Sequence, residues 1–346
     1  GANPPPVRHR HPPRRRKVGH LDRFQRRHHW LGFPIAVTYK FFEDQGNFLA
    51  ALITYYGFIS LFFLMLLFVT ILGFLAQGDP GIRKTLLSSA LAHFPIVGKQ
   101  IQSHVHSLGG GVIRLIVGLV VSIHGGLEVV QAGWNAFHRI WMVPRQDRRN
   151  PIQTRARSLV VLFVLGLGVL LTTALSGFTT NAVTYFGVVG RVAGTALSVA
   201  LNIGIFSFAF RWLTSADLTF KDVAVGAVLA GLCWQALQSV GTFYVARALQ
   251  GVSAIGGLFA VVLGLLAWIY LEAVITVICA EINVVHSRRL WPRALGALFT
   301  DTPNLTDADR RVYRAYAHIE RYKSYERITV DFFPYEDEEK DRDGPG

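Results

Sequence analysis

Two long runs without a charged residue constrain the fold of this chain more than any other feature. Residues 45–78 and 158–190 contain no Asp, Glu, Lys or Arg, and each run exceeds the roughly 20 residues that an α-helix needs to cross a bilayer core. Only 16% of the 346 residues are charged, whereas soluble domains carry about 25%. The sequence therefore predicts an all-α, polytopic membrane protein and excludes an ordinary soluble enzyme.

Hydropathy divides the chain into a membrane domain and two flanking segments. The membrane domain is expected over residues 25–290. Its six predicted spans lie at about 48–76, 111–136, 158–180, 192–210, 223–246 and 254–283. The second span carries Arg114 and Glu128 near the ends of a short uncharged stretch, and a buried or re-entrant segment is the alternative there.

The flanking segments differ in composition from the spans. Residues 1–24 are rich in Arg, His and Pro and are expected to be disordered. The aromatic and basic stretch before the first span, interrupted by Pro34, predicts a helical elbow in the membrane interface. Residues 291–346 are expected to form a cytoplasmic tail with an acidic end, in which Thr306 and Asp309 resemble a capping box that starts a short helix.

The distribution of positive charge predicts the orientation. If the six spans are correct, 29 of the 35 Lys and Arg residues lie on one side of the membrane, which the positive-inside rule assigns to the cytoplasm together with both termini. Trp141, Trp212 and Trp291 fall at the same face, as expected for an aromatic belt.

Several enzyme classes are disfavoured by the sequence. The two cysteines, Cys233 and Cys279, lie in apolar runs, which excludes a disulfide scaffold and a multi-cysteine metal site. A P-loop sequence is absent, so the chain is not an ATP-driven pump of that type. We expect no cofactor and no metal.

Short motifs in a fixed order resemble one family of bacterial inner-membrane proteins. Residues 40–66, KFFEDQGNFLAALITYYGFISLFFLML, contain an acidic residue, a Tyr-Tyr pair and a Ser-Leu-Phe phrase, with Phe63 where a proline is usual. Further matches follow near the end of the second span and over the last two spans. The residues that carry the resemblance are Asp44, Tyr55, Tyr56, Ser60, Asn135, Tyr244, Gly256, Trp268, Glu281 and Asn283. Taken in order, they resemble the YihY/BrkB family.

The resemblance implies a six-helix inner-membrane protein associated with envelope integrity or virulence, without an agreed biochemical activity. Members of this family once carried a ribonuclease label. This sequence has no carboxylate or histidine cluster with metal-ligand spacing, so we expect neither nuclease chemistry nor a nucleic-acid partner.

Ionisable groups at membrane depth are costly and each is a candidate functional group. The polar pathway suggested by the sequence consists of Arg114, His124, Glu128, Gln131 and Glu272. The alternative for each is a structural ion pair or a position close to the interface. Glu281, on roughly the opposite face of the last span from Glu272, is also explained as an anchor for a basic residue such as Arg288.

Two arginines are predicted at the external ends of spans. Arg191 and Arg247 are candidates for contacts with anionic lipid headgroups, and the alternative is simple snorkelling to the interface. The basic leader beside the first span has the same expected partner, anionic lipid.

Two functions of different classes remain open. One is the transport or flipping of an anionic lipid or amphipathic solute through a polar cavity lined by the second, fifth and sixth spans. The other is a scaffold that holds envelope-assembly proteins through its helix faces and charged tails. A transporter should have Glu128 or Glu272 facing a cavity, whereas a scaffold should have both sealed in ion pairs.

Overall fold

The computed structural model describes residues 29–75, 112–148, 150–248, 254–295 and 305–332, without the side chains of some helical residues. The described residues form helices and connecting segments and contain no strand, so the predicted all-α class is confirmed. The predicted basic leader, the connection between the first two spans and the acidic end of the tail lie outside the described residues.

Seven α-helices make up the described part of the chain. They are α2 (His29–Glu43), α3 (Gly46–Leu75), α6 (Val112–Ile140), α7 (Pro151–Trp212), α8 (Phe220–Ala248), α9 (Ala254–Ser287) and α10 (Asp307–Ile319). Five of them, α3 and α6 to α9, contain a segment long and apolar enough to cross a membrane. The second predicted span is a continuous helix, α6, and is not interrupted at Arg114 or Glu128.

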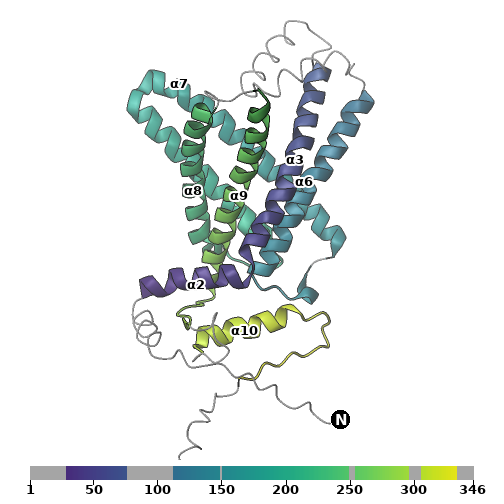
Figure 1. Cartoon of the computed structure of the whole chain (residues 1–346), viewed down its shortest axis with the longest axis vertical. Helices are drawn as coiled ribbons and strands as arrows, with labels where there is room; N and C mark the ends of the chain where they lie inside the picture. Colours follow the sequence, from purple (N-terminus) through teal and green to yellow (C-terminus); the bar gives the residue numbers. More distant parts are fainter. Residues whose placement is uncertain (1–28, 76–111, 149, 249–253, 296–304, 333–346) are drawn as a thin grey trace, which may run out of the picture.

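The helix α7 is a bent rod that holds two of the predicted spans. Gly187 has non-helical dihedral angles, with φ 57° and ψ −133°, which glycine adopts without a steric penalty. The limbs on either side fold back on each other, since Gly168 of the first limb faces Ile205 of the second. The predicted spans 158–180 and 192–210 therefore fall on the two limbs, and a single glycine takes the place of a loop (Figure 1).

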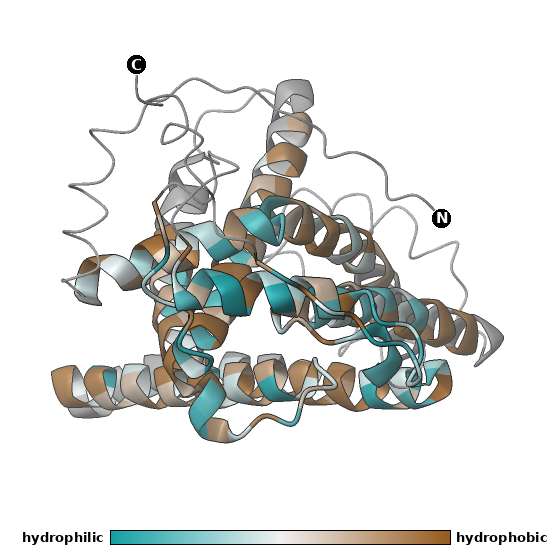
Figure 2. Cartoon of the chain, turned by 90° about the horizontal axis from the view of Figure 1, so that it is seen from below, coloured by the Kyte–Doolittle hydropathy of each residue, from teal (hydrophilic) through white to brown (hydrophobic). Residues whose placement is uncertain are grey.

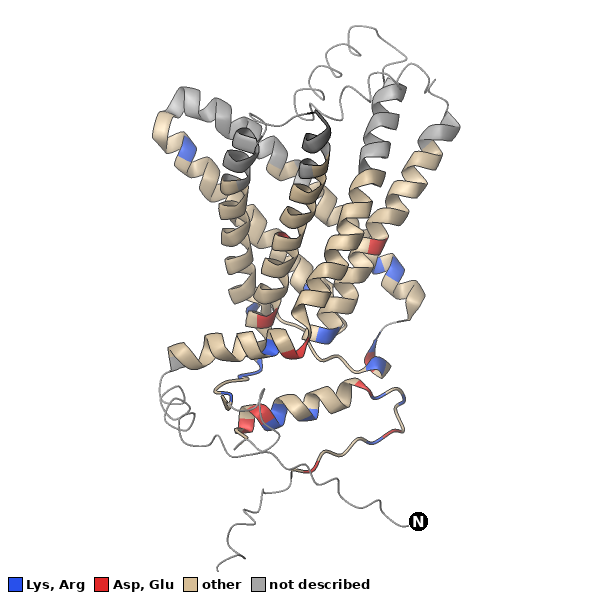
Figure 3. Ribbon diagram, viewed as in Figure 1, with Lys and Arg blue, Asp and Glu red and all other residues tan. Residues whose placement is uncertain are grey.

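One end of the bundle, which we call the base, is crossed by two helices. Figure 1 shows α2 lying crosswise under the long helices, with α10 below it. Pro34 lies inside α2 and does not end it, although a proline at this position removes one backbone hydrogen bond of the helix. Thr306 and Asp309 form the capping box expected for α10. The Lys and Arg residues of the described part of the chain gather mainly at this end (Figure 3).

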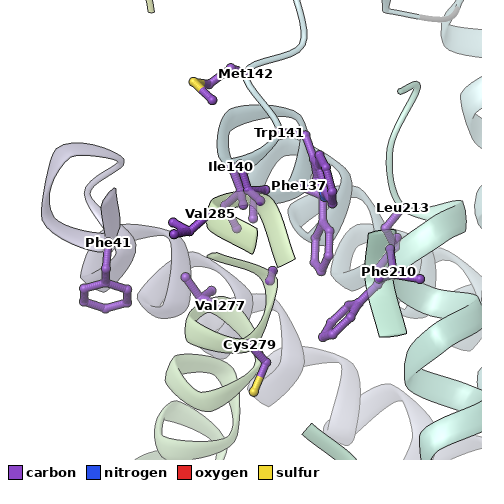
Figure 4. Packing of buried hydrophobic residues seen from close by; sticks show 14 of the residues in the cluster. Phe41, Phe137, Ile140, Trp141, Met142, Phe210, Leu213, Val277, Cys279 and Val285 are labelled. Atoms are coloured by element: carbon purple, nitrogen blue, oxygen red, sulfur yellow. The ribbon is translucent and has the colours of Figure 1, made fainter. Parts of the chain in front are cut away.

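The tightly packed core also lies at the base. Phe137 of α6, Trp141 just after α6, Phe210 of α7, and Val277 and Cys279 of α9 are buried in one cluster (Figure 4). Seen from the base and coloured by hydropathy, the long helices consist largely of hydrophobic residues (Figure 2), as expected for helices in a membrane. Trp141 is only 1% exposed, so it packs inside the base and does not face outward as a residue of an aromatic belt does.

The buried hydrophobic residues are unevenly distributed along the spans. In α3, α6, the second limb of α7, α8 and α9, all of those with described side chains lie in the half of the helix nearest the base. In the other half, the described hydrophobic side chains are exposed or half-buried. Among the residues whose side chains are described, the tight packing of the helices is therefore concentrated at the base.

Candidate functional site

A buried network of charged side chains joins four helices at the base. We call it the base cluster, and it consists of Lys40 and Glu43 from α2, Asp44 from the turn after α2, Arg139 from α6, Glu281 from α9, Arg293 from the segment after α9, and Asp309 and Tyr316 from α10. Buried charges are costly unless they are paired. The cluster is therefore the strongest polar feature of the described residues.

Lys40 lies at the centre of this cluster. Its ammonium group forms an ion pair with Asp44, four residues further along and just after the end of α2, and lies 3.4 Å from Oε2 of Glu281. It also donates a hydrogen bond of 3.0 Å to the backbone carbonyl of Ile140, at the end of α6. All three charged side chains are completely buried. Lys40 thus connects α2 to both α6 and α9.

The two carboxylates around Lys40 have few hydrogen-bond donors. Neither oxygen of Glu281 accepts a hydrogen bond within the described part of the chain, and the same is true of Oδ1 of Asp44. Arg139 approaches that oxygen with its Nε at 3.7 Å, which is too long for a hydrogen bond. A single ammonium group thus carries most of the compensation for two buried carboxylates.

The turn between α2 and α3 places Asp44 in this position. Gln45 has a left-handed backbone, with φ 58°, and a β-carbon on the next residue, Gly46, would lie 2.3 Å from the ring of Phe41. The glycine therefore allows α3 to start directly against α2. This close turn keeps Asp44 pointing at Lys40, away from the apolar span.

The other half of the cluster ties α10 to α2. The guanidinium group of Arg293 donates two hydrogen bonds to the carboxylate of Glu43, at 2.6 and 3.1 Å, and a third, from Nε, to Asp309 at 2.5 Å. Burial alone would lower the pKa of Arg293, but the two carboxylates raise it above its ordinary value. Arg293 therefore stays charged and acts as the anchor of α10.

Tyr316 of α10 links the two halves of the cluster. Its hydroxyl group donates to Oε2 of Glu43 at 3.4 Å, and Nζ of Lys40 lies 5.5 Å from the centre of its ring. Burial raises the pKa of Tyr316, and the negative charges of Asp44, Glu43 and Glu281 raise it further. The phenol is thus neutral and surrounded by carboxylates.

A close contact between α8 and α9 lies on the other side of α9. The backbone N–H of Gly226 donates a hydrogen bond of 2.6 Å to Oδ1 of Asn283. A β-carbon at Gly226 would lie 2.1 Å from the carbonyl oxygen of Cys279, so only glycine lets the helices approach this closely. Glu281 and Asn283, which belong to one predicted motif, therefore face two different neighbours, α2 and α8.

The predicted pathway residues of α6 are less buried than the core residues of the same helix. His124 and Glu128 are on one face, with 3.9 Å between Nε2 and Oε1, and their side chains are 69% and 41% exposed. Gln131 follows on the same helix and is half-buried. Arg114 belongs to α6, but its side chain lies outside the described residues.

Glu272, the deepest carboxylate predicted from the sequence, is half-buried on α9. Its Oε1 accepts a hydrogen bond of 2.7 Å from the indole of Trp268, one turn earlier. No ion pair to Glu272 is found among the described residues. Trp268, which was singled out by resemblance, therefore orients the carboxylate of Glu272.

The remaining predicted residues are dispersed. Tyr55 and Tyr56 of α3 stack edge to face, with ring centres 5.2 Å apart, and Ser60 donates to the backbone of its own helix. Asn135 is exposed on α6. The side chain of Tyr244 on α8 and the surroundings of Gly256 on α9 are not among the described features.

The arginines predicted to contact headgroups are not brought together in the described structure. Arg191 is exposed on the second limb of α7, and the side chain of Arg247 at the end of α8 is not described. Lys40, Arg139 and Arg293 were not singled out by the sequence. Arg288, the suggested partner of Glu281, lies over the ring of Trp141 instead, at 5.8 Å from its centre.

Comparison with known proteins identifies a family and a relative that resemble this chain. The chain matches the family described as virulence factor BrkB over residues 37–297, a range that includes the base cluster apart from its α10 residues. It is also similar to the inner membrane protein YhjD of Escherichia coli (strain K12), with 22% identity over 268 residues that cover 71% of this chain and 78% of the relative. No solved structure matches the chain.

Proposed function

The chain belongs to the virulence factor BrkB family and is a multi-pass inner membrane protein, and from this premise we propose that it transports or flips an anionic lipid or another amphipathic solute. The observation that carries the proposal is the uneven packing of the spans. Their buried hydrophobic residues gather at the base, and beyond it the described hydrophobic residues are exposed or half-buried. We propose that the base is the closed side of a transporter whose substrate enters from the other side.

The state of the two deep carboxylates favours transport over a scaffold. A scaffold would hold Glu128 and Glu272 in closed ion pairs, because an unpaired charge in the membrane has no structural benefit. Glu272 instead accepts a hydrogen bond from Trp268 and has no ion pair among the described residues, whereas Glu128 lies 3.9 Å from His124 and is 41% exposed. Glu272 is therefore the group that we propose contacts a polar headgroup.

We further propose that the base faces the cytoplasm, together with both termini. The Lys and Arg residues around α2, α10 and the segments between the helices support this orientation (Figure 3). Anionic lipids of the inner leaflet are attracted to such a surface, at about 1 kcal/mol for each nearby basic residue.

The proposal is tested with purified protein in liposomes that contain fluorescent anionic phospholipid, by measuring exchange between the leaflets. The variants are Glu272→Gln, Glu128→Gln and Arg114→Ala. Glu320→Gln is the matched control, because Glu320 makes an exposed ion pair with Arg145, 3.1 Å away, at the base. A hydrogen bond to a charged group is worth about 1.5–3 kcal/mol, so Glu272→Gln should slow exchange about tenfold or more.

The outcome decides between the two function classes. Fast exchange in wild type and in Glu320→Gln, with slow exchange in folded Glu272→Gln, supports transport. If wild type exchanges lipid no faster than protein-free liposomes, with several lipid classes and with a proton gradient, the transport proposal is wrong.

A further inference from the structure

We propose that Asp44 and Glu281 form a proton-binding pair inside the base, and that the proton bound there is the ion that drives the transport proposed above. The first part of this inference concerns the chemistry of the base cluster alone. The second part rests on the proposed function, and the experiment below separates the two.

The two carboxyl groups lie against one shared cation. Both side chains are completely buried, Asp44 forms an ion pair with the ammonium group of Lys40, and Oε2 of Glu281 lies 3.4 Å from the same group. Both are acceptors as carboxylates, so neither satisfies the other. Oε1 and Oε2 of Glu281 and Oδ1 of Asp44 have no hydrogen-bond donor in the described structure, and buried acceptors without donors are rare in proteins.

The charges around the pair leave one negative charge in excess. The groups that face it are Lys40 and Glu43 from α2, Arg139 from α6, Arg293 from the segment after α9, and Asp309 and neutral Tyr316 from α10. The helix α3 has no charged residue, and Asp222 of α8 is bonded to Ser287 instead. With Asp44 and Glu281 included, three cations are opposed by four carboxylates. One added proton neutralises the cluster.

Lys40 makes a metal ion an unsuitable ligand for this site. Its ammonium group contacts both carboxylates, so a cation between them would be strongly repelled. In addition, the described residues contain no group of three or more His, Cys, Asp or Glu side chains that could hold a metal. A proton avoids this repulsion because it becomes part of a carboxyl group.

The binding step is a simple proton transfer. A hydronium ion gives its proton to an oxygen of Glu281, so that an O–H bond forms on the carboxyl group and a water molecule is left. The neutral carboxyl group then donates a hydrogen bond to Oδ1 of Asp44, the acceptor that lacks a donor. Lys40 keeps its ion pair with Asp44 and loses its attraction to Glu281. Release of the proton to water reverses each change.

This step connects protonation to the packing of the helices. The 3.4 Å contact between Lys40 and Glu281 is the charged link between α2 and α9. Proton binding replaces that link with a neutral hydrogen bond, and the attraction that holds α9 against α2 weakens. The base is the tightly packed end of the bundle, so a proton bound there favours the separation of the helices at this end.

Infrared spectroscopy of the full-length protein in lipid tests the proton site without any transport measurement. A protonated carboxyl group has a carbonyl stretching band, separate from that of a carboxylate, that shifts in D2O. We expect such a band in wild type, with an intensity that falls as pH rises, and its loss in Glu281→Gln. That variant mimics the protonated carboxyl group, so it should fold, and Glu320→Gln should keep the band. If Glu281→Gln does not fold, Asp44→Asn should shift the same band.

Exchange measured with and without a proton gradient tests the coupling. A gradient should accelerate lipid exchange several-fold in wild type and leave Glu281→Gln unchanged. The absence of any band that Glu281→Gln removes or Asp44→Asn shifts, at any pH at which the protein is folded, overturns the proton site. A band without exchange supports the site and contradicts the proposed function, whereas exchange that a gradient does not alter overturns the coupling alone.

Discussion

The contact between α8 and α9 at Gly226 allows a stability prediction whose size follows from the structure. Gly226→Ala places a methyl carbon 2.1 Å from the carbonyl oxygen of Cys279 and 2.6 Å from Nδ2 of Asn283, whereas non-bonded heavy atoms pack best at about 3.5–4.0 Å. The first atom belongs to the backbone, so a side-chain rotation cannot relieve the clash. The helices must separate.

Two contributions lower the free energy of unfolding when α8 and α9 separate. Overpacking of a tight contact costs about 1–3 kcal/mol, and the hydrogen bond from Gly226 to Asn283, now 2.6 Å long, is worth about 1 kcal/mol more. We therefore expect Gly226→Ala to lower the free energy of unfolding by about 2–4 kcal/mol. Reversible unfolding of the purified protein in mixed detergent micelles, followed by tryptophan fluorescence, measures this quantity.

A second glycine on α9 provides the matched control. A β-carbon at Gly264 meets no atom within 4 Å, and alanine is favoured over glycine in a helix by about 1 kcal/mol. Gly264→Ala should therefore be as stable as wild type or more stable. If Gly226→Ala unfolds within about 0.5 kcal/mol of wild type, the range of an ordinary surface substitution, then α8 and α9 are not held as closely as the structure indicates.

Three further predictions concern the attachment of α10. Arg293→Lys cannot reproduce the paired hydrogen bonds to Glu43, and since breaking a buried ion pair costs about 3–5 kcal/mol, limited proteolysis should cut at α10 in this variant and spare wild type. Thr306→Ala removes the capping box and should destabilise α10 by about 1 kcal/mol, seen as faster hydrogen exchange of that helix alone. The folded protein raises the pKa of Tyr316 above its ordinary 10.0, so wild type should lose stability as pH rises beyond that value, where the unfolded state releases the proton first. Unfolding measured against pH should show a weaker alkaline loss in Tyr316→Phe, and an unchanged profile would contradict the assigned surroundings of the phenol.

The parts of the fold that depend on local signals could be predicted from the sequence. The capping box at Thr306 and Asp309 is such a signal, because its partners are three residues apart. The aromatic and basic stretch around Pro34 is another such signal. It predicted a helix before the first span, and α2 is that helix, continuous through Pro34. Trp141 was assigned to the interface by its position in the sequence, whereas the turn after α6 buries it.

The candidate site was only partly predictable, since its pairs are remote in sequence. Asp44 and Glu281 were selected by resemblance, but their common partner Lys40 was not. Arg293 bonds to Glu43, 250 residues away, and a basic residue close to the membrane surface is usually explained by topology. Hydropathy reports the depth of each residue but not which helices are neighbours.

The position of Glu281 and Asn283 on α9 gives the base two joints of different chemistry. Glu281 faces α2 through the ion pair with Lys40, and Asn283 faces α8 through the backbone of Gly226. The second joint is neutral and sterically tight, so neither a proton nor a change in salt concentration weakens it. The first joint depends on charge, so the proposed protonation of Glu281 weakens it. We therefore expect an opening of the base to separate α9 from α2 and to leave α8 and α9 together.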